Sequence, residues 1–244
     1  MRGQLHVKKR GQFTRNLHHI AYHLFFMYFY VLQKNITMIE ALEPQLAAKR
    51  APNDPINDSI AQRKITYEIP KAGETAPLFL LPDENGNKVL LEDLIKKGPV
   101  ILSFFKGNWC EVCDLELRAH QRALPEFKKY GATLVAISPH TISVSYQLKS
   151  EKELTYCILS DSGNEIANLY GLRFEIQKPL LDAFASFGLD FTQLHGDQGE
   201  NTGTLPIPGT FVIGVGGRII YSFVDSDHTK RAEPADIVAV LMTK

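Results

Sequence analysis

From residue 100 onward, the hydrophobic pattern of the chain alternates between short continuous apolar runs and longer stretches with helical spacing. A continuous apolar run of strand length is typical of a strand buried on both faces, as in parallel α/β sheets. Two strands separated by a Gly-Gly turn predict a hairpin. The predicted strands are Val100–Phe105, Thr133–Ser138 and Tyr156–Leu159, followed by the hairpin strands Thr210–Val215 and Arg218–Val224.

Between these strands, apolar residues recur at intervals of three and four, which predicts amphipathic helices. The predicted helices are Glu111–Lys129, Ser143–Glu153, Asn164–Tyr170 and, closing the chain, Glu233–Met242. Pro125 lacks the amide hydrogen that a helix interior needs, so we expect it to kink or interrupt the first of these helices. Ahead of them, residues 76–91 predict a strand, a turn and a second strand, and Glu92–Lys97 predicts one or two helical turns.

The order of these elements predicts an α/β fold, a three-layer α/β/α sandwich with a mixed central sheet. In α/β sheets, functional groups gather at the carboxyl ends of the parallel strands. We therefore expect the chemistry of this protein directly after Phe105.

Three regions differ in amino-acid composition and hydrophobic pattern. They are a basic and apolar extension at residues 1–37, a helical lead-in and linker at residues 38–70, and one domain at residues 71–244 with a mixed insertion at about 172–205. Within the lead-in, residues 39–50 and 59–67 have helical spacing, and residues 51–58 are rich in turn formers. Within the insertion, helical potential is highest near Pro179–Phe187.

The extension contains a 13-residue apolar run, Ile20–Leu32, behind a cluster of basic residues. The run is shorter than the about 20 residues that span a bilayer as a helix. Three interpretations stay open: upstream sequence ahead of a true start at Met38, a membrane-surface segment, or a secretory signal. Since no apolar pattern there matches a face of the domain, we expect the fold and activity to survive removal of residues 1–37.

Charge and cysteine content narrow the class of protein. Residues 1–38 carry six cations and no acid, so the 27 basic and 27 acidic residues leave 21 cations against 27 acids in the remainder. A mildly acidic domain gives no sign of nucleic-acid binding. Three cysteines are too few for a disulfide framework, which favours a cytoplasmic protein.

The candidate chemistry is the run Lys106-Gly-Asn-Trp109-Cys110-Glu-Val-Cys113, which falls where a strand is predicted to end and a helix to begin. Two cysteines three residues apart can form a reducible disulfide, and the positive end of a helix stabilises a thiolate. A zinc site would need a second ligand pair at suitable spacing, which the sequence lacks. Redox chemistry is favoured over two inert buried cysteines.

Three groups of residues, in order, resemble the alkyl hydroperoxide reductase/thiol-specific antioxidant (AhpC/TSA) family, in particular its peroxiredoxin-like members with a WCxxC motif. They are Gly73-Glu-Thr-Ala-Pro77-x-Phe79-x-Leu81-Pro82, Ser103-Phe-Phe-x-Gly107-x-Trp109-Cys110 and Leu205-Pro-x-Pro208-x-Thr210-Phe-Val-Ile213, with a similar tail at Phe223–Pro234. The resemblance implies a thioredoxin-like fold, peroxide reduction by thiols, a thioredoxin-like protein reductant and, as one option, a homodimer. We see no metal, flavin or nicotinamide motif, so we expect no cofactor.

The peroxiredoxin pattern Pro-x-x-x-Thr/Ser-x-x-Cys places the peroxide-reacting cysteine at Cys113 and a matching glutamate at Glu116. Cys110 then occupies the Thr/Ser position and Lys106 the proline position. The family's peroxide-steadying arginine would fall near Pro208, where the sequence has none.

Instead, Ile207-Pro208 ahead of Thr210 resembles the cis-proline loop of thioredoxins, which packs against the dithiol. The resemblance therefore implies a hybrid site, with a thioredoxin-like dithiol in a peroxiredoxin-like frame.

Several side chains have both a functional and a structural interpretation. Trp109 is expected to shape the redox surface rather than only cover a sheet edge. Glu116 and Arg118 either tune a thiolate or lie on a solvated helix face, and Lys106 either favours a thiolate or is an ordinary loop lysine. We expect Cys157 to be a buried core residue and a free thiol.

The remaining polar candidates are five. His140 would line the site or be a plain loop histidine, and Asp225, Asp227 and His228 are expected to be solvated loop residues. His120 lies about 10 Å along the helix from Cys113 and is not expected to act as a base.

Two enzyme hypotheses and one binding hypothesis follow. The first is a thiol peroxidase in which Cys113 attacks a peroxide and Cys110 resolves the resulting sulfenic acid as a disulfide. The second is a thioredoxin-like reductase of protein disulfides, favoured by Trp109, Cys110 and Pro208. The third is a redox-sensing interaction module that uses the insertion as its partner surface.

Overall fold

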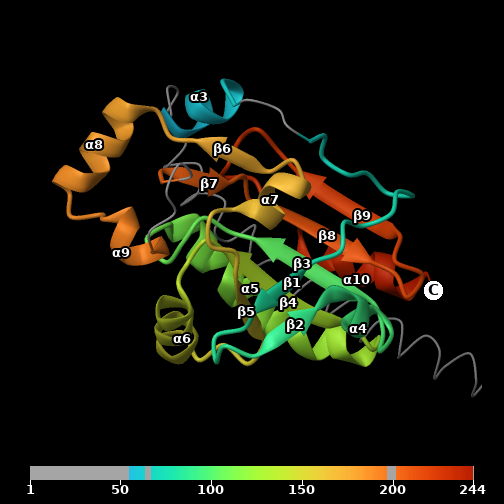
Figure 1. The fold of residues 1–244 in the computed structure, drawn as a ribbon. Coiled ribbons are helices and arrows are strands. Elements are labelled where there is room, and N and C mark those ends of the chain that lie inside the picture. Colours follow the sequence, from blue (N-terminus) through green and yellow to red (C-terminus); the bar gives the residue numbers. More distant parts are fainter. Residues whose placement is uncertain (1–54, 64–66, 197–201, 244) are drawn as a thin grey trace, which may run out of the picture.

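The computed structural model describes residues 55–63, 67–196 and 202–243 (Figure 1). The expectations for residues 1–37 and for a helix at residues 39–50 lie outside the described residues. A helix was expected at residues 59–67. The structure has helix α3 earlier, at Pro55–Ala61. The start signal is Pro55, which is preorganised for the first turn of a helix.

A five-stranded sheet in the order β5-β4-β3-β8-β9 forms the centre of the domain (Figure 1). The parallel strands β3, β4 and β5 pair in register, and the hairpin strands β8 and β9 add to β3 in antiparallel sense. The bounds are β3 Val100–Phe104, β4 Thr133–Ser138, β5 Cys157–Ser160, β8 Gly209–Ile213 and β9 Ile219–Val224. The mixed sheet expected from the apolar runs is thereby confirmed.

Two hydrophobic cores lie on opposite faces of this sheet. Ile101 of β3 packs with helices α5 (Glu111–Lys129) and α10 (Pro234–Met242) on one face. The neighbouring Leu102 faces the other core, with helices α4 (Leu91–Ile95) and α7 (Glu165–Leu169). Successive strand residues point to opposite faces, so an uninterrupted apolar run supplies both cores. The result is the expected three-layer α/β/α sandwich.

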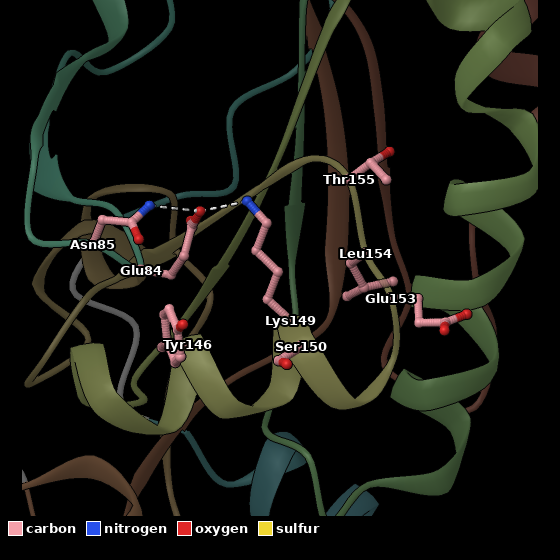
Figure 2. A pocket seen from close by; sticks show the side chains of 8 residues that line it. All are labelled: Glu84, Asn85, Tyr146, Lys149, Ser150, Glu153, Leu154 and Thr155. Carbon is pink, nitrogen blue, oxygen red and sulfur yellow. Dashed lines mark hydrogen bonds and ion pairs between the residues drawn. The ribbon is translucent and has the colours of Figure 1, made fainter.

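Helix α6 (Ile142–Glu151) packs beside β5 and is tied to the turn between β1 (Leu80–Pro82) and β2 (Lys88–Leu90). Lys149 pairs with the buried carboxylate of Glu84, whose second oxygen accepts the Ile158 amide hydrogen at 3.1 Å. Figure 2 shows this contact in an open pocket of about 500 Å³ between the turn and α6. Since the carboxylate is already bonded, its evident role is to hold the hairpin on the sheet.

The insertion is more ordered than its sequence suggests. Strand β6 (Arg173–Glu175) pairs with β7 (Thr204–Pro206), and between them lie α8 (Lys178–Ser186) and α9 (Phe191–His195). Helix α8 confirms the expected helical potential, whereas β6, α9 and β7 were not expected. In Figure 1, α9 (orange) lies beside the start of α5 and α8 extends outward from it, which places the α9 end of the insertion against the predicted redox motif.

Helix α5 continues through Pro125, so of the two expected effects of this proline the interruption does not occur. Its buried residues on both sides of the proline, Ala123, Leu124 and Phe127, pack into the core and favour a continuous helix over the lost backbone hydrogen bond. Within the described ranges, no helix combines the length and the hydropathy needed to cross a membrane.

Candidate functional site

The two cysteines lie where the sequence predicted, between the carboxyl end of β3 and the first turn of α5. Cys110 is the N-cap residue of α5, and its Sγ accepts a hydrogen bond from the Cys113 amide at 3.3 Å. A sulfur in this position takes the place of a capping oxygen and lies at the positive end of a 19-residue helix. The local geometry therefore favours negative charge on the Cys110 sulfur.

The two thiols differ in acidity. Burial raises the pKa of Cys110, but the hydrogen bond from Cys113 and the positive charges of Lys106 and Arg231 outweigh it and lower the pKa to about 6. Burial, followed by the hydrogen bond with Cys110 and the charge of that thiolate, raises the pKa of Cys113 well above its usual range. At neutral pH the pair therefore holds one thiolate, on Cys110, and one thiol, on Cys113.

A buried ion pair lies against the thiols. Arg231 Nε donates to Glu116 Oε2 at 2.7 Å, and Arg231 Nη2 donates to Cys113 Sγ at 3.5 Å. Burial and the nearby Cys113 raise the pKa of Glu116, the charge of Arg231 lowers it, and the net value is about 7. Glu116 thus belongs to the site, and the alternative of a solvated helix face is wrong for this residue. The same alternative holds for Arg118, which is exposed and pairs with Asp114.

Arg231 is the main functional residue that sequence reasoning missed. The sequence has no arginine next to Pro208; the guanidinium at the dithiol comes from the loop between β9 and α10, more than a hundred positions after Cys113. Its backbone anchors are the carbonyls of His228 and Lys230. The only signal in the sequence was the similarity of the tail at Phe223–Pro234 to the family.

Lys106 is a buried residue of the site rather than an ordinary loop lysine. Its side chain is 1 % exposed, and Nζ lies 2.9 Å from His228 Nδ1. The ammonium also lies over the Trp109 ring, 5.8 Å from the ring centroid. His228, expected in a solvated loop, is buried by this contact.

An aromatic cap covers the other side of the motif. The Trp109 ring packs at 5.6 Å from both Phe184 of α8 and Phe191 of α9. His140, after β4, accepts the Asn108 amide hydrogen on Nε2 at 3.2 Å and lies at 5.7 Å, ring to ring, from His195. His140 therefore lines the motif, in line with the first of its two interpretations.

The loop at Pro208 is adjacent to the motif but differs from the expected geometry. Because Gly209 pairs with Phe104 and Thr210 with Ser103, the amino end of β8 lies beside the carboxyl end of β3. The described residues contain no cis peptide bond, so the expected cis geometry at Ile207-Pro208 is wrong. The Ile207 amide bonds to the Leu172 carbonyl at 2.7 Å, and the chain runs extended from β7 into β8. The hydroxyl of Thr210 is buried without a partner among the described residues.

Cys157 lies apart from the dithiol. It begins β5 and pairs with Val135, whereas Cys110 follows the opposite end of β3, with β4 in between. It is half-buried rather than fully buried as expected, because it lies at the edge of the sheet. Burial, and then the charge of Glu84, raises the pKa of Cys157, so its thiol is protonated at neutral pH.

Among the described residues, Asp83, Glu84 and Cys157 group closely enough to suggest a metal ion. Both Asp83 oxygens already accept hydrogen bonds from Asn85 and Asn87, and Glu84 is held by Lys149 and the Ile158 amide. The group therefore fits a turn-stabilising network. His120 lies on the buried face of α5, and burial, followed by the charge of Arg231, lowers its pKa to about 4.

Relatives of two classes are among the curated proteins that the chain matches. The thiol-disulfide oxidoreductase ResA of Bacillus thuringiensis subsp. konkukian (strain 97-27) is 30% identical over 101 residues, or 41% of this chain and 57% of the relative. The chloroplastic peroxiredoxin Q of Suaeda salsa is 31% identical over 100 residues, or 41% of this chain and 46% of the relative. The chain thus spans about half the length of the curated relatives it matches.

Solved structures support the same fold. Peroxidoxin BcpB from Mycobacterium tuberculosis matches with a TM-score of 0.55 at 21% identity, covering 71% of this chain and 97% of the other. The thiol peroxidase from Chromobacterium violaceum matches with a TM-score of 0.57 at 17% identity, covering 74% and 91%. The AhpC/TSA family model matches residues 72–222, which span the sheet, the dithiol and the insertion. With its thioredoxin-like fold and this match over more than half of its length, the chain belongs to the AhpC/TSA family.

Proposed function

We propose that the protein is a thiol-dependent peroxidase that reduces hydrogen peroxide or organic hydroperoxides through Cys110 and Cys113. One observation carries the proposal: a low-pKa thiolate, a second thiol and a buried guanidinium meet at the start of α5 in an AhpC/TSA domain. The thiolate supplies the nucleophile, and the guanidinium stabilises negative charge that develops on a peroxide oxygen.

The proposed chemistry has two steps on the enzyme. The Cys110 thiolate attacks the terminal oxygen of the peroxide, so that an S–O bond forms and the O–O bond breaks, leaving a sulfenic acid and an alkoxide or hydroxide. Cys113 then attacks the Cys110 sulfur; the disulfide forms, and the hydroxyl leaves as water with the Cys113 proton. An external dithiol protein of the thioredoxin type reduces this disulfide and restores both thiols.

The acidities within the pair speak for Cys110 as the attacking thiol, although the peroxiredoxin pattern predicted Cys113. The expectation for Cys113 rested on its match to a sequence position, whereas the thiolate itself is stabilised by the N-cap geometry of Cys110. Cys110 is also the more exposed residue of the two, at 6% against none for Cys113.

Two variants test the assignment. In Cys113→Ser, the remaining Cys110 thiolate should absorb at 240 nm with a midpoint near pH 6, react once with peroxide and accumulate a trappable sulfenic acid. Cys110→Ser should lose that titration and show a slow reaction. Sulfenic acid that accumulates only in Cys110→Ser would assign the attack to Cys113.

A reductase of protein disulfides is the second candidate function. It is favoured by Trp109 directly before the dithiol and by the 30% identity to a thiol-disulfide oxidoreductase. Steady-state turnover of hydrogen peroxide and of insulin disulfides by one preparation, with the same reductant, separates the two. We expect the peroxide to be turned over at least about tenfold faster, because both sulfurs are nearly inaccessible to a protein disulfide. Faster reduction of insulin would favour the reductase.

A further inference from the structure

Lys106 carries a buried charge that bonds to no carboxylate among the described residues. Among the described residues, the one hydrogen-bond partner of its ammonium is the Nδ1 of His228, at 2.9 Å, and the ring of Trp109 lies beneath it. Because an unpaired ammonium is costly to bury, a charge of opposite sign must lie close by.

Among the described groups near Lys106, the dithiol is the one that responds to its charge, which lowers the pKa of Cys110. The loop after β9 contributes His228 and Arg231, and α5 contributes Cys110, Cys113 and Glu116. Arg231 and Glu116 balance one another through their direct ion pair, 2.7 Å in length. The imidazoles of His228 and, behind the motif, His140 accept hydrogen bonds on Nδ1 and Nε2 respectively. The thiolate of the pair is thus the anion that remains for Lys106.

This balance changes during the proposed cycle. Once the thiolate has become part of a disulfide, the Arg231–Glu116 pair is still neutral, but Lys106 no longer has an anion. A buried amine in that position loses its proton, because the neutral form is the one that burial favours. Lysine gives up its proton readily on burial, whereas arginine does not.

We propose that Lys106 is the proton donor of the catalytic cycle, giving its proton to the oxygen that leaves the peroxide and regaining one when the disulfide is reduced. The proposal rests on the thiol-peroxidase function above. The O–O bond breaks as the S–O bond forms, and the alkoxide takes a proton from the Lys106 ammonium, leaving an alcohol and a neutral amine. In reduction, one proton of the external dithiol goes to Cys113 and the other to Lys106, while Cys110 leaves as the thiolate.

Proton uptake during reduction tests this without any peroxide. The reduced and oxidised proteins are equilibrated with reduced and oxidised dithiothreitol at several pH values between about 7 and 8. This window lies above the Cys110 pKa of about 6 and below the usual thiol range. Dithiothreitol releases two protons there. The equilibrium constant is therefore independent of pH if the protein takes up two protons, and rises about tenfold per pH unit if it takes up only the one on Cys113.

We expect a nearly flat profile for the wild type and a slope of about tenfold per pH unit for Lys106→Met and Lys106→Arg. The arginine variant is the decisive one, since it keeps the positive charge beside the thiolate but cannot give up its proton. Lys97→Met, at an exposed lysine, is the matched control and should keep the wild-type profile. Glu116→Gln is the second comparison: the pKa of Glu116, about 7, lies at the lower edge of this window, so this variant shows how much of the slope comes from Glu116, and the dependence on Lys106 should remain in it.

A wild-type slope equal to that of Lys106→Arg would overturn the proposal, and a slope below half of that value supports it. A slope that changes in Glu116→Gln but not in the lysine variants would assign the proton to Glu116 and also overturn it. This test uses the dithiothreitol couple and no peroxide. If the proposed peroxidase function is wrong, the protein will fail to turn over peroxide while its redox equilibrium with dithiothreitol stays intact.

Discussion

Glu116 and Arg231 are both almost fully buried, and their side chains meet at 2.7 Å beside the two thiols. An ion pair in such a place adds little net stability, because each charge loses its hydration, yet breaking it leaves an uncompensated charge in the interior. The ion pair instead positions the Arg231 guanidinium, which contacts Cys113 and lowers the pKa of Cys110. At this scale, the site is a small set of mutually dependent charges.

We predict that the two charges are strongly coupled in unfolding. Arg231→Met alone should lower the free energy of unfolding by about 3 to 5 kcal/mol, because Glu116 is left buried without a counter-ion. The double variant Glu116→Leu/Arg231→Met should cost less than Arg231→Met alone. Urea unfolding of the reduced proteins at fixed pH measures both effects.

The exposed pair of Asp114 and Arg118 on the same helix is the control for that cycle. Arg118→Met should cost no more than about 1 kcal/mol, since solvent screens this pair. Additive effects of the Glu116 and Arg231 variants would contradict the coupling.

At the scale of elements, the insertion completes the site from outside the sheet. Helices α8 and α9 are short and have few buried residues, so their position depends on the contacts of Phe184 and Phe191 with Trp109. Both helices lie in the chain between the paired strands β6 and β7, which connect them to the domain. The cap is thus held by the aromatic cluster, by Leu181 and Leu194 packed on the core, and by the hydrogen bond from the Thr141 amide to the Leu194 carbonyl.

We predict that Phe191→Ala opens the cap while the sheet stays folded. Phe191 is 5% exposed, and a buried Phe→Ala change removes about 3 to 5 kcal/mol of packing. Trp109 is the only tryptophan, so its fluorescence should shift to the red and become easier to quench with acrylamide.

Phe187→Ala, at a residue that is 84% exposed, is the matched control and should leave the Trp109 emission unchanged. An unchanged emission in Phe191→Ala as well would show that the cap does not depend on this cluster.

At the scale of the whole molecule, the sheet separates the three cysteines into two environments. The dithiol follows the carboxyl end of β3, while Cys157 begins β5 at the other end and two strands away. Because three consecutive parallel strands define these ends, no local rearrangement of the α5 amino terminus brings Cys157 to the dithiol.

We predict that peroxide treatment yields a Cys110–Cys113 disulfide and leaves Cys157 as a free thiol. Mass mapping of the alkylated, non-reduced protein measures the pairing. Cys157→Ser should keep the wild-type peroxide turnover. A disulfide that includes Cys157 would instead require extensive unfolding of the sheet during the cycle.

The sequence by itself determined the strands and helices of the sandwich and the place of the dithiol. These depend on local periodicity: apolar runs for Val100–Phe105 and Thr133–Ser138, helical spacing after Cys110, and a cysteine spacing that is meaningful without a partner. The interruption expected at Pro125 and the cis geometry expected at Pro208 were wrong, because the packing of α5 and the extended run from β7 into β8 override them.

Only the tertiary structure decided the electrostatics of the site. Arg231 and His228 reach the dithiol from the far end of the chain because β9 lies in the same sheet as β3 and its following loop folds back over α5. No pattern within a short window can report such a contact, and the burial that shifts the acidity of Cys110, Cys113 and Glu116 arises from the same assembly. The acidity of a group depends on which charges share its low-dielectric surroundings, and folding alone brings those charges together.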